Sequence, residues 1–134
     1  METTSLDAQS LDELDRASYI SLATFRRTGV AVETAVWFAR EGDKLYVFTE
    51  SRAGKIKRLR NDPHVRVATC SVSGKVRGDW LEGSARRVEE PAVIESAYAA
   101  LRKKYGWQMM LADGLSGLSG RIHKRAIVEI SLAG

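Results

Sequence analysis

Short runs of β-branched and aromatic residues, each ended by a turn, are the feature that most constrains how this chain folds. Three such runs follow one another: Tyr19–Phe25, Val30–Ala39 and Lys44–Thr49. They are separated by Thr28-Gly29 and by Glu41-Gly42-Asp43. Turns this short join strands that pair antiparallel. The pattern therefore predicts an antiparallel β-meander in the first half of the chain.

Three more strands are predicted in the second half, at His64–Val72, Lys75–Glu89 and Arg121–Leu132. The middle one contains Gly78 and Gly83, and glycines inside a strand indicate the bulges or sharp bends that a closed barrel needs. Strands do not alternate with helices as they do in βαβ units, so a Rossmann fold is not expected. The pattern predicts a mainly β fold, a six-stranded antiparallel β-barrel with α-helices.

The three predicted helices lie at about residues 10–17, 51–61 and 91–105. Ser10 and Glu13 form a capping-box pattern at the start of the first. Pro91 begins the third and Gly106 ends it. The third helix has an apolar face, and its members recur at helical spacing: Ile94, Ala97, Tyr98, Leu101 and Tyr105.

Length and composition favour one globular domain over residues 1–134, with residues 1–9 as a flexible arm. The 134 residues are 44 % hydrophobic, which is enough to build a core. No apolar run approaches the roughly 20 residues of a membrane span, and the polar N-terminus does not resemble a secretory signal. Cys70 is the one cysteine, which excludes an internal disulfide and a thiolate metal cluster. We expect a cytoplasmic protein without a metal site and without a membrane partner.

A net charge of +4 allows either nucleic acid or a smaller polyanion as partner. Aromatic and basic residues are not interleaved as in nucleic-acid-binding surfaces, so a phosphorylated small molecule is preferred. His64 and His123 are interpreted as structural residues, and Cys70 as a small core residue in mid-strand. No acid–base pair stands out, and the catalytic residues are not identified.

The start of the predicted 51–61 helix breaks several local rules. With Ser51 as N-cap, Arg52 and Lys55 fall in the first turn, where the helix dipole disfavours cations. Gly54 in the same turn costs about 1 kcal/mol relative to alanine. A bound anion resolves the conflict, because the first-turn N–H groups, these cations and the Ser51 and Thr49 hydroxyls would converge on a phosphate. The alternative is a basic surface helix with no ligand.

The motif Thr-x-Ser-Arg-x-x-Lys-x-x-x-Leu-Arg-x-Asp-Pro, at residues 49–63, and the segment "GDWLEGSARRVEEP", at residues 78–91, carry a resemblance. The chain resembles the pyridoxamine 5'-phosphate oxidase-like split β-barrel superfamily, and within it the flavin/deazaflavin oxidoreductase branch. That resemblance implies a six-stranded, FMN-binding-like split barrel. Members are homodimers that bind two cofactors at the interface.

The resemblance also implies a set of cofactor-binding residues. Ser51, Arg52 and Lys55 would hold the cofactor phosphate, with Thr49 beside it. The flavin ring would lie along the second strand, at Thr34, Ala35, Val36 and Trp37. The partner chain would complete the site with Trp80 or Arg121.

FMN and the deazaflavin F420 share a ribityl phosphate, so the phosphate site cannot distinguish them. The F420 tail adds negative charge, and several cations are available to favour it: Lys57, Arg58, Arg60, Lys75, Arg77, Arg86 and Arg87. The expected function is F420-dependent hydride transfer to a small conjugated or heteroaromatic substrate. An FMN-dependent oxidoreductase and a non-catalytic carrier of flavin or deazaflavin stay open as alternatives. Pyridoxamine phosphate oxidation is not expected, because the C-terminal substrate signature of that enzyme is missing.

Overall fold

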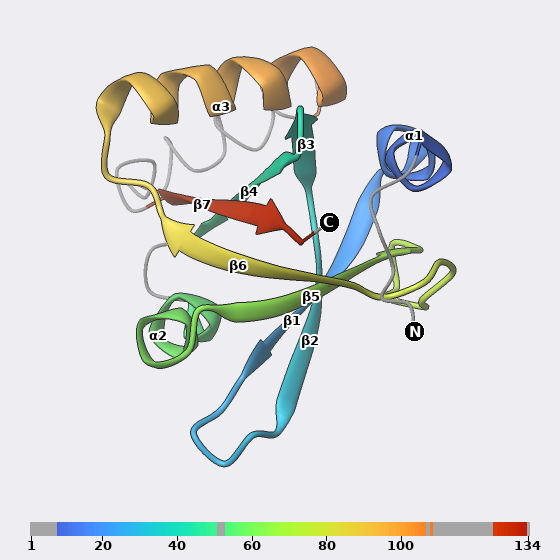
Figure 1. Ribbon diagram of the computed structural model, residues 1–134. Coiled ribbons are helices and arrows are strands. Elements are labelled where there is room, and N and C mark those ends of the chain that lie inside the picture. The colour runs from blue at the N-terminus through green and yellow to red at the C-terminus, as the bar shows by residue number, and fades with distance from the viewer. Residues whose placement is uncertain (1–7, 51–52, 107, 109–124, 134) are drawn as a thin grey trace.

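An antiparallel β-sheet that curls on itself forms the body of the molecule, and helices pack around it (Figure 1). The computed structural model describes residues 8–50, 53–106, 108 and 125–133. Within these ranges the elements are α1 (Ala8–Arg16), β1 (Tyr19–Phe25), β2 (Ala31–Val36), β3 (Phe38–Glu41), β4 (Lys44–Glu50), α2 (Gly54–Asn61), β5 (His64–Cys70), β6 (Leu81–Arg87), α3 (Pro91–Tyr105) and β7 (Arg125–Leu132). None of the helices in this part of the chain has the length and apolar character needed to cross a membrane.

The run predicted as one strand at Val30–Ala39 is divided into β2 and β3, with only Trp37 between them. The strand order is β2-β1-β5-β6-β7-β4-β3, so these two neighbours in sequence lie at opposite edges of the sheet. The backbone at Trp37 therefore carries the chain from one edge to the other and joins the edges of a split barrel. This crossing explains why the described sheet has seven strands where six were predicted. The predicted mainly β split barrel is confirmed.

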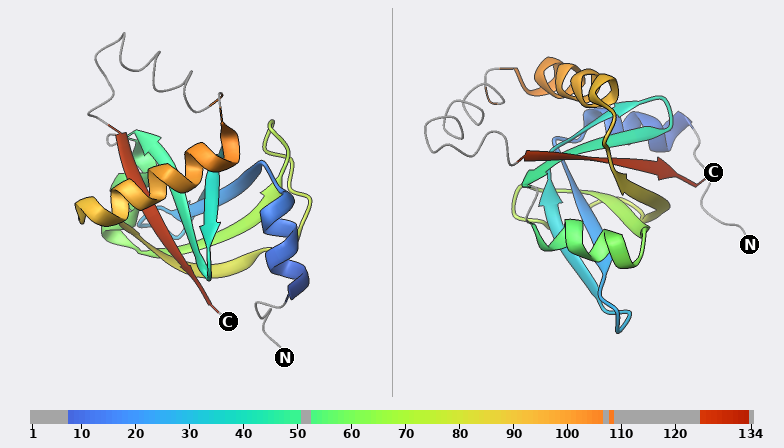
Figure 2. Two further views of the ribbon diagram at one scale, coloured as in Figure 1. Left: turned by 90° about the horizontal axis from the view of Figure 1, so that it is seen from above. Right: turned by 90° about the vertical axis from the view of Figure 1, so that its left-hand side faces the viewer.

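Apolar side chains from almost every strand fill the barrel interior. The largest of them are fully buried: Ile20, Leu22, Phe38, Leu45, Val47, Val65, Val67 and Ile130. From α2, Ile56 and Leu59 join this cluster, so the helix closes one end of the barrel. Figure 2 shows α2 and α3 on opposite sides of the sheet.

The α3 helix covers a second apolar cluster outside the barrel, formed with residues of β3, β4 and β7. Ala97, Leu101 and Tyr105 are buried there, and Ile94 and Tyr98 are partly buried. The predicted apolar face is therefore confirmed. The helix ends where predicted, since Gly106 adopts a φ of 59° and donates its N–H to the Arg102 carbonyl.

The predicted start of the first helix and the predicted extent of the fifth strand are wrong. Ser10 lies inside α1 and is not its N-cap, because the helix already includes Ala8. The long strand predicted at Lys75–Glu89 is shorter, because the chain from residue 71 to 80 folds back over the end of β5 before β6 begins. Cys70 consequently ends β5, where it is buried but outside the interior cluster.

The glycines of the predicted long strand have separate roles. Gly78 belongs to the fold-back, and a Cβ there would lie 2.5 Å from the Thr69 hydroxyl oxygen. Gly83 lies inside β6, and a Cβ there would lie 2.9 Å from the Ser131 carbonyl oxygen. Both positions therefore require close backbone approach, as internal strand glycines often do.

The Tyr105 side chain fastens the crossing between β2 and β3. Its hydroxyl accepts a hydrogen bond from the Phe38 N–H at 2.9 Å. The same hydroxyl lies 2.8 Å from the Ser18 carbonyl oxygen and 2.9 Å from the Phe38 carbonyl oxygen, to which it can donate. Its ring stacks on Trp37 with centroids 4.6 Å apart. Burial raises the pKa of Tyr105 to about 12, so the hydroxyl keeps its proton for this role.

Replacing Tyr105 with phenylalanine should lower the free energy of unfolding by about 1–3 kcal/mol, because the buried Phe38 N–H loses its acceptor. Urea denaturation followed by circular dichroism measures the change. Lys103→Ala, at an exposed position in the same helical turn, is the control and should stay within about 0.5 kcal/mol of wild type. Equal unfolding free energies for wild type and Tyr105→Phe would show that the hydroxyl does not stabilise the crossing.

Candidate cofactor-binding site

A cavity of about 530 Å³ lies where the β2–β3 crossing, the end of β4 and the start of α2 meet. Five of the ten predicted site residues line it: Ala35, Val36, Trp37, Thr49 and Lys55. The other lining residues were not predicted: Tyr19, Phe48, Glu50, Ala53 and Arg125. The fold therefore brings the predicted ring-binding strand and the predicted phosphate-binding lysine to one cavity. The volume suits a small-molecule ligand.

The α2 helix begins later than predicted. Ala53 is its N-cap, with extended backbone and no side-chain capping bond, and Gly54 is its first residue. The prediction had Ser51 as the N-cap and Arg52 as the first helical residue, and both of these lie outside the described residues. Packing explains the start, since Ala53 lies against the interior cluster. A Cβ on Gly54 would lie 2.9 Å from the Arg58 guanidinium, so glycine leaves room for that side chain.

Lys55 is half-buried in the cavity wall near the end of β4. Its ammonium donates a hydrogen bond to the buried Thr49 hydroxyl at 3.5 Å. Burial lowers the pKa of Lys55, and the nearby Arg58 guanidinium lowers it further, while Glu50 acts in the opposite direction. Burial and the neighbouring Arg58 thus both disfavour the charged form of Lys55.

Arg58, one of the seven cations proposed to favour F420, is half-buried, whereas Lys57 and Arg60 of the same helix are exposed. Its Nε donates to the hydroxyl of the fully buried Thr24 at 2.6 Å. Burial and the charge of Arg26 lower its pKa. The sequence did contain a signal that Arg58 lies beside Lys55: the two cations are three residues apart, which puts them on one helical face. The apolar stripe of the helix obscured that signal.

Lys55 and Arg58 share an unusual feature: each bonds a threonine hydroxyl, and neither forms an ion pair among the described residues. The nearest acid, Glu50, is exposed and lies 4.0 Å from Arg125. Half-buried cations normally have anionic partners. The positive charge, the cavity and the start of a helix together fit a phosphate.

The remaining predicted residues have other places. Thr34 lies in β2 but does not line the cavity; its hydroxyl is buried and has no hydrogen-bond partner within the described part of the chain. Trp80 is half-buried just before β6 and is not on this chain's cavity wall. Arg121 and His123 lie outside the described residues. His64 begins β5, as predicted, and its Nε2 lies 3.0 Å from Glu82.

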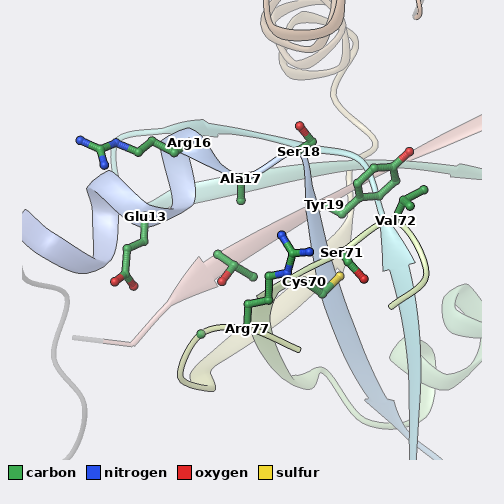
Figure 3. A pocket seen from close by; sticks show the side chains of 11 residues that line it. Glu13, Arg16, Ala17, Ser18, Tyr19, Cys70, Ser71, Val72 and Arg77 are labelled. Atoms are coloured by element: carbon green, nitrogen blue, oxygen red, sulfur yellow. The ribbon is translucent and has the colours of Figure 1, made fainter. Parts of the chain in front are cut away.

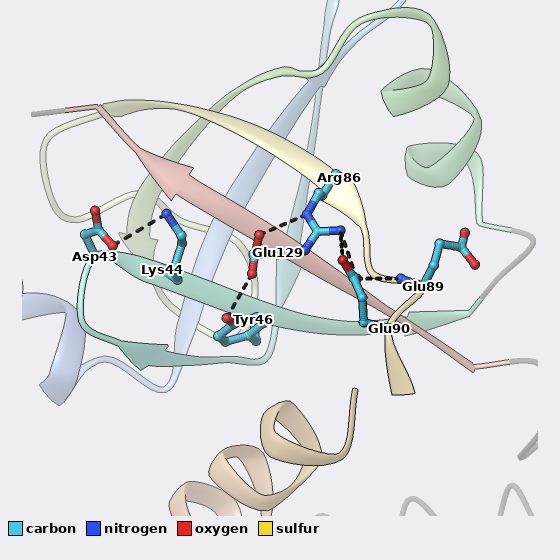
Figure 4. A network of polar contacts seen from close by, with 7 residues as sticks. All are labelled: Asp43, Lys44, Tyr46, Arg86, Glu89, Glu90 and Glu129. Carbon is cyan, nitrogen blue, oxygen red and sulfur yellow. Dashed lines mark hydrogen bonds and ion pairs between the residues drawn. The ribbon is translucent and has the colours of Figure 1, made fainter. Parts of the chain in front are cut away.

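Among the seven cations proposed to favour F420, Arg86 is engaged in ion pairs. Arg86 bonds Glu129 and Glu90, each at 3.0 Å, and Glu129 also accepts from the Tyr46 hydroxyl at 2.9 Å (Figure 4). This network ties β4, β6 and β7 to the start of α3. It makes Arg86 a structural residue.

The family of the chain follows from comparison with known proteins. A model of the family described as pyridoxamine 5'-phosphate oxidase matches residues 6–133. The chain belongs to the pyridoxamine 5'-phosphate oxidase family. No curated protein matches the sequence.

Solved structures share the fold of this family member. A conserved hypothetical protein of Mycobacterium tuberculosis is similar with a TM-score of 0.72 and 23 % identity, over 98 % of this chain and 82 % of the other. A FAD-binding protein of Mesorhizobium loti has a TM-score of 0.65 and 16 % identity, over 96 % and 90 %. A structure described as F420 reductase has a TM-score of 0.61 and 20 % identity, over 98 % and 97 %. At such identities the likeness shows a common fold.

Replacing Arg58 with glutamine should raise the pKa of Lys55, because a neighbouring like charge is removed. The pKa should stay below the ordinary 10.5, since burial is the larger cause and persists. An NMR titration of the lysine side chain measures it. Arg60→Gln, exposed on the same helix, is the matched control and should leave Lys55 unchanged. An unchanged Lys55 pKa in Arg58→Gln would contradict the proposed electrostatic coupling.

Proposed function

We propose that this chain is an oxidoreductase that uses the deazaflavin F420 and reduces a small conjugated or heteroaromatic substrate in the cytoplasm. The observation that carries the proposal is the pair Lys55 and Arg58. Both are partly buried cations with hydroxyl partners, and Lys55 lines a cavity that the predicted ring-binding residues Ala35, Val36 and Trp37 also line. A phosphorylated, planar cofactor suits both features.

The side chains at the cavity have distinct proposed roles. The phosphate would be held by Lys55 and Arg58, together with the predicted Ser51 and Arg52. Arg58 would bind it either by giving up its hydrogen bond to Thr24 or by using other N–H groups of its guanidinium. Ala35, Val36 and Trp37 would line the ring and exclude water from one of its faces. Trp37 is suited to this because its ring is fixed against Tyr105. When bound, the cofactor would supply the hydride that such substrates accept.

The choice of F420 over FMN is supported by charge and by one structural relative. Lys57 and Arg60 are exposed on α2 and could attract an anionic tail, whereas Arg86 is engaged elsewhere. One structure of the same fold is described as F420 reductase. Another is described as FAD-binding, which favours the alternatives of an FMN-dependent enzyme or a carrier of flavin.

We expect the functional unit to be a homodimer with its two cofactors at the interface. The lining of the cavity leaves Trp80 unused within one chain. A role for Trp80 toward the partner's cofactor is consistent with that position. The resemblance gives Arg121, which lies outside the described residues, as the other candidate. The dimer is a proposal from the resemblance to this family.

Titration of the purified chain with F420 and with FMN, followed by cofactor fluorescence, tests the site. Lys55→Ala should weaken binding of the preferred cofactor at least about tenfold, the loss of one charge-assisted contact of about 1.5–3 kcal/mol. Lys103→Ala, which removes an exposed cation on α3 that does not line the cavity, is the control and should bind within about threefold of wild type. Unaltered affinity of Lys55→Ala would place the phosphate elsewhere.

The same titration separates the alternatives. Tighter binding of FMN than of F420 would replace the deazaflavin proposal with the FMN-dependent one. Binding without oxidation of the reduced cofactor by any conjugated acceptor would favour a carrier. Binding of neither cofactor would overturn the proposed function.

Mixing two defective chains tests the shared site. Lys55→Ala and Trp80→Ala homodimers should each bind cofactor weakly, the second through its effect on the partner's site. A mixed dimer combines both defects in one site and leaves the other intact, so re-associated mixtures should regain about a quarter of the wild-type tight sites by random pairing. Fluorescence titration after co-refolding counts these sites. No regain, or a monomer by sedimentation, would contradict an interface contribution from Trp80.

A further inference from the structure

A second cavity, of about 590 Å³, lies between α1, the start of β1 and the fold-back that follows β5 (Figure 3). Residues from all three contribute to it, among them Glu13, Arg16, Tyr19, Cys70, Ser71 and Arg77. Its volume is ample for a small organic molecule. None of the ten cofactor-binding residues predicted from the sequence lines it, but Arg77, one of the seven cations proposed to favour F420, does.

Tyr19 connects this cavity to the candidate cofactor cavity, because its side chain belongs to the wall of both. In the sheet, Tyr19 pairs with Cys70 on one side. On the other side β1 pairs with β2, whose last residues lead to Trp37. Tyr19 is the one described residue that lines both cavities. A molecule in the second cavity and a cofactor beside Trp37 would therefore both be next to Tyr19.

Backbone hydrogen bonds fix the main chain of Arg77 beside the second cavity. Its N–H donates to the Thr69 carbonyl at 2.8 Å, and the N–H of Gly78 shares that carbonyl at 3.4 Å. Val76 forms a β-bridge with Cys70. The missing side chain of Gly78 allows this contact, since a Cβ would meet the Thr69 hydroxyl. The fold-back therefore fixes the backbone position from which the exposed Arg77 side chain extends.

The charge of Arg77 is not compensated within the described part of the chain. No ion pair or side-chain hydrogen bond of its guanidinium occurs there, although Glu13 lies on the α1 side of the cavity. The second arginine, Arg16, instead pairs with Asp12 at 3.1 Å. Burial raises the pKa of the Cys70 thiol despite the opposing effect of Arg77, so a thiolate does not neutralise the arginine. Figure 3 shows the Arg77 side chain reaching toward Cys70 and Ser71.

We propose that this cavity is the second-substrate site and that Arg77 binds the carboxylate of a small organic acid there. A planar guanidinium matches a carboxylate with two parallel hydrogen bonds. A phosphate dianion fits less well, because the other arginine is engaged and Glu13 repels it. Ala17, Tyr19 and the exposed Val72 offer apolar surface for the rest of the molecule. The assignment as second substrate rests on the proposed function, whereas carboxylate binding at Arg77 does not.

Benzoate is a suitable probe, used on the full chain without cofactor and followed by backbone amide NMR shifts. We expect saturable shifts at Ser71 and Arg77 but not at Lys55, with an affinity in the millimolar range for so small a ligand. Arg77→Gln should weaken binding at least about tenfold. Lys75 is an exposed cation two residues earlier that does not line the cavity, so Lys75→Gln is the matched control and should leave the benzoate affinity unchanged. Benzamide has the same ring as benzoate but no charge. Its affinity for wild type should therefore be no higher than the affinity of benzoate for Arg77→Gln.

Two results would overturn the site: equal benzoate affinity in wild type and Arg77→Gln, or shifts confined to the Lys55 side. The role as second-substrate site has its own readout. With F420 or FMN bound, benzoate should change the cofactor fluorescence in wild type but not in Arg77→Gln, while cofactor affinity stays the same in both. A fluorescence unaffected by saturating benzoate would overturn that role. If neither cofactor binds but benzoate still binds at Arg77, the proposed function fails and the carboxylate site stands.

Discussion

Between Val36 and Phe38 the backbone leaves one edge of the sheet and joins the other, and the Tyr105 hydroxyl holds this crossing in place. The N–H of Phe38 is buried and needs an acceptor, which no neighbouring strand supplies at the crossing. The last turn of α3 supplies it and stacks a ring on Trp37. Lys104 adds a further contact, with its ammonium 3.5 Å from the centre of the Phe38 ring. Closure of the barrel thus depends on a helix that follows the crossing by many residues in the chain.

The crossing also explains where the cavities lie. It brings the end of β2 beside the end of β4 and the start of α2, which together enclose the candidate cofactor cavity. On the far side of Tyr19, the fold-back after β5 encloses the other cavity. Rigid, hydrogen-bonded backbone forms both, so their walls are in place without a ligand. Such preorganisation reduces the ordering that binding would otherwise require.

The electrostatics of the two cavities follow one pattern. Lys55, Arg58 and Arg77 each lie on or near a cavity, and none has a carboxylate partner among the described residues. Some other cations are paired, as Arg40 is with Asp15, Arg86 with Glu90 and Glu129, and Arg66 with Glu82. Exposed cations such as Lys57, Arg60 and Lys75 form no ion pair among the described residues. Lys55 and Arg58 differ from those exposed cations in being partly buried, which makes an unpaired charge unfavourable and an anionic ligand a suitable partner. Arg77 is exposed, and what distinguishes it is its place in the lining of a cavity.

The sequence by itself determined what depends on near neighbours. Alternation located the strands, spacing located the apolar face of α3, and Gly106 marked its end, because each is a local pattern of residue types. It also brought Ala35, Val36, Trp37, Thr49 and Lys55 into one predicted site, through the resemblance. Only the tertiary structure decided the crossing at Trp37, the start of α2 at Gly54, the inward turn of Arg58 and the fold-back that places Arg77. Each of these depends on a contact made only in the folded chain. Tyr105 holds the crossing, and the barrel interior takes up the start of α2. Thr24 bonds Arg58, and the Thr69 carbonyl holds the backbone of Arg77. Local patterns carry no information on those contacts, which is the physical reason that the folded chain was needed to find them.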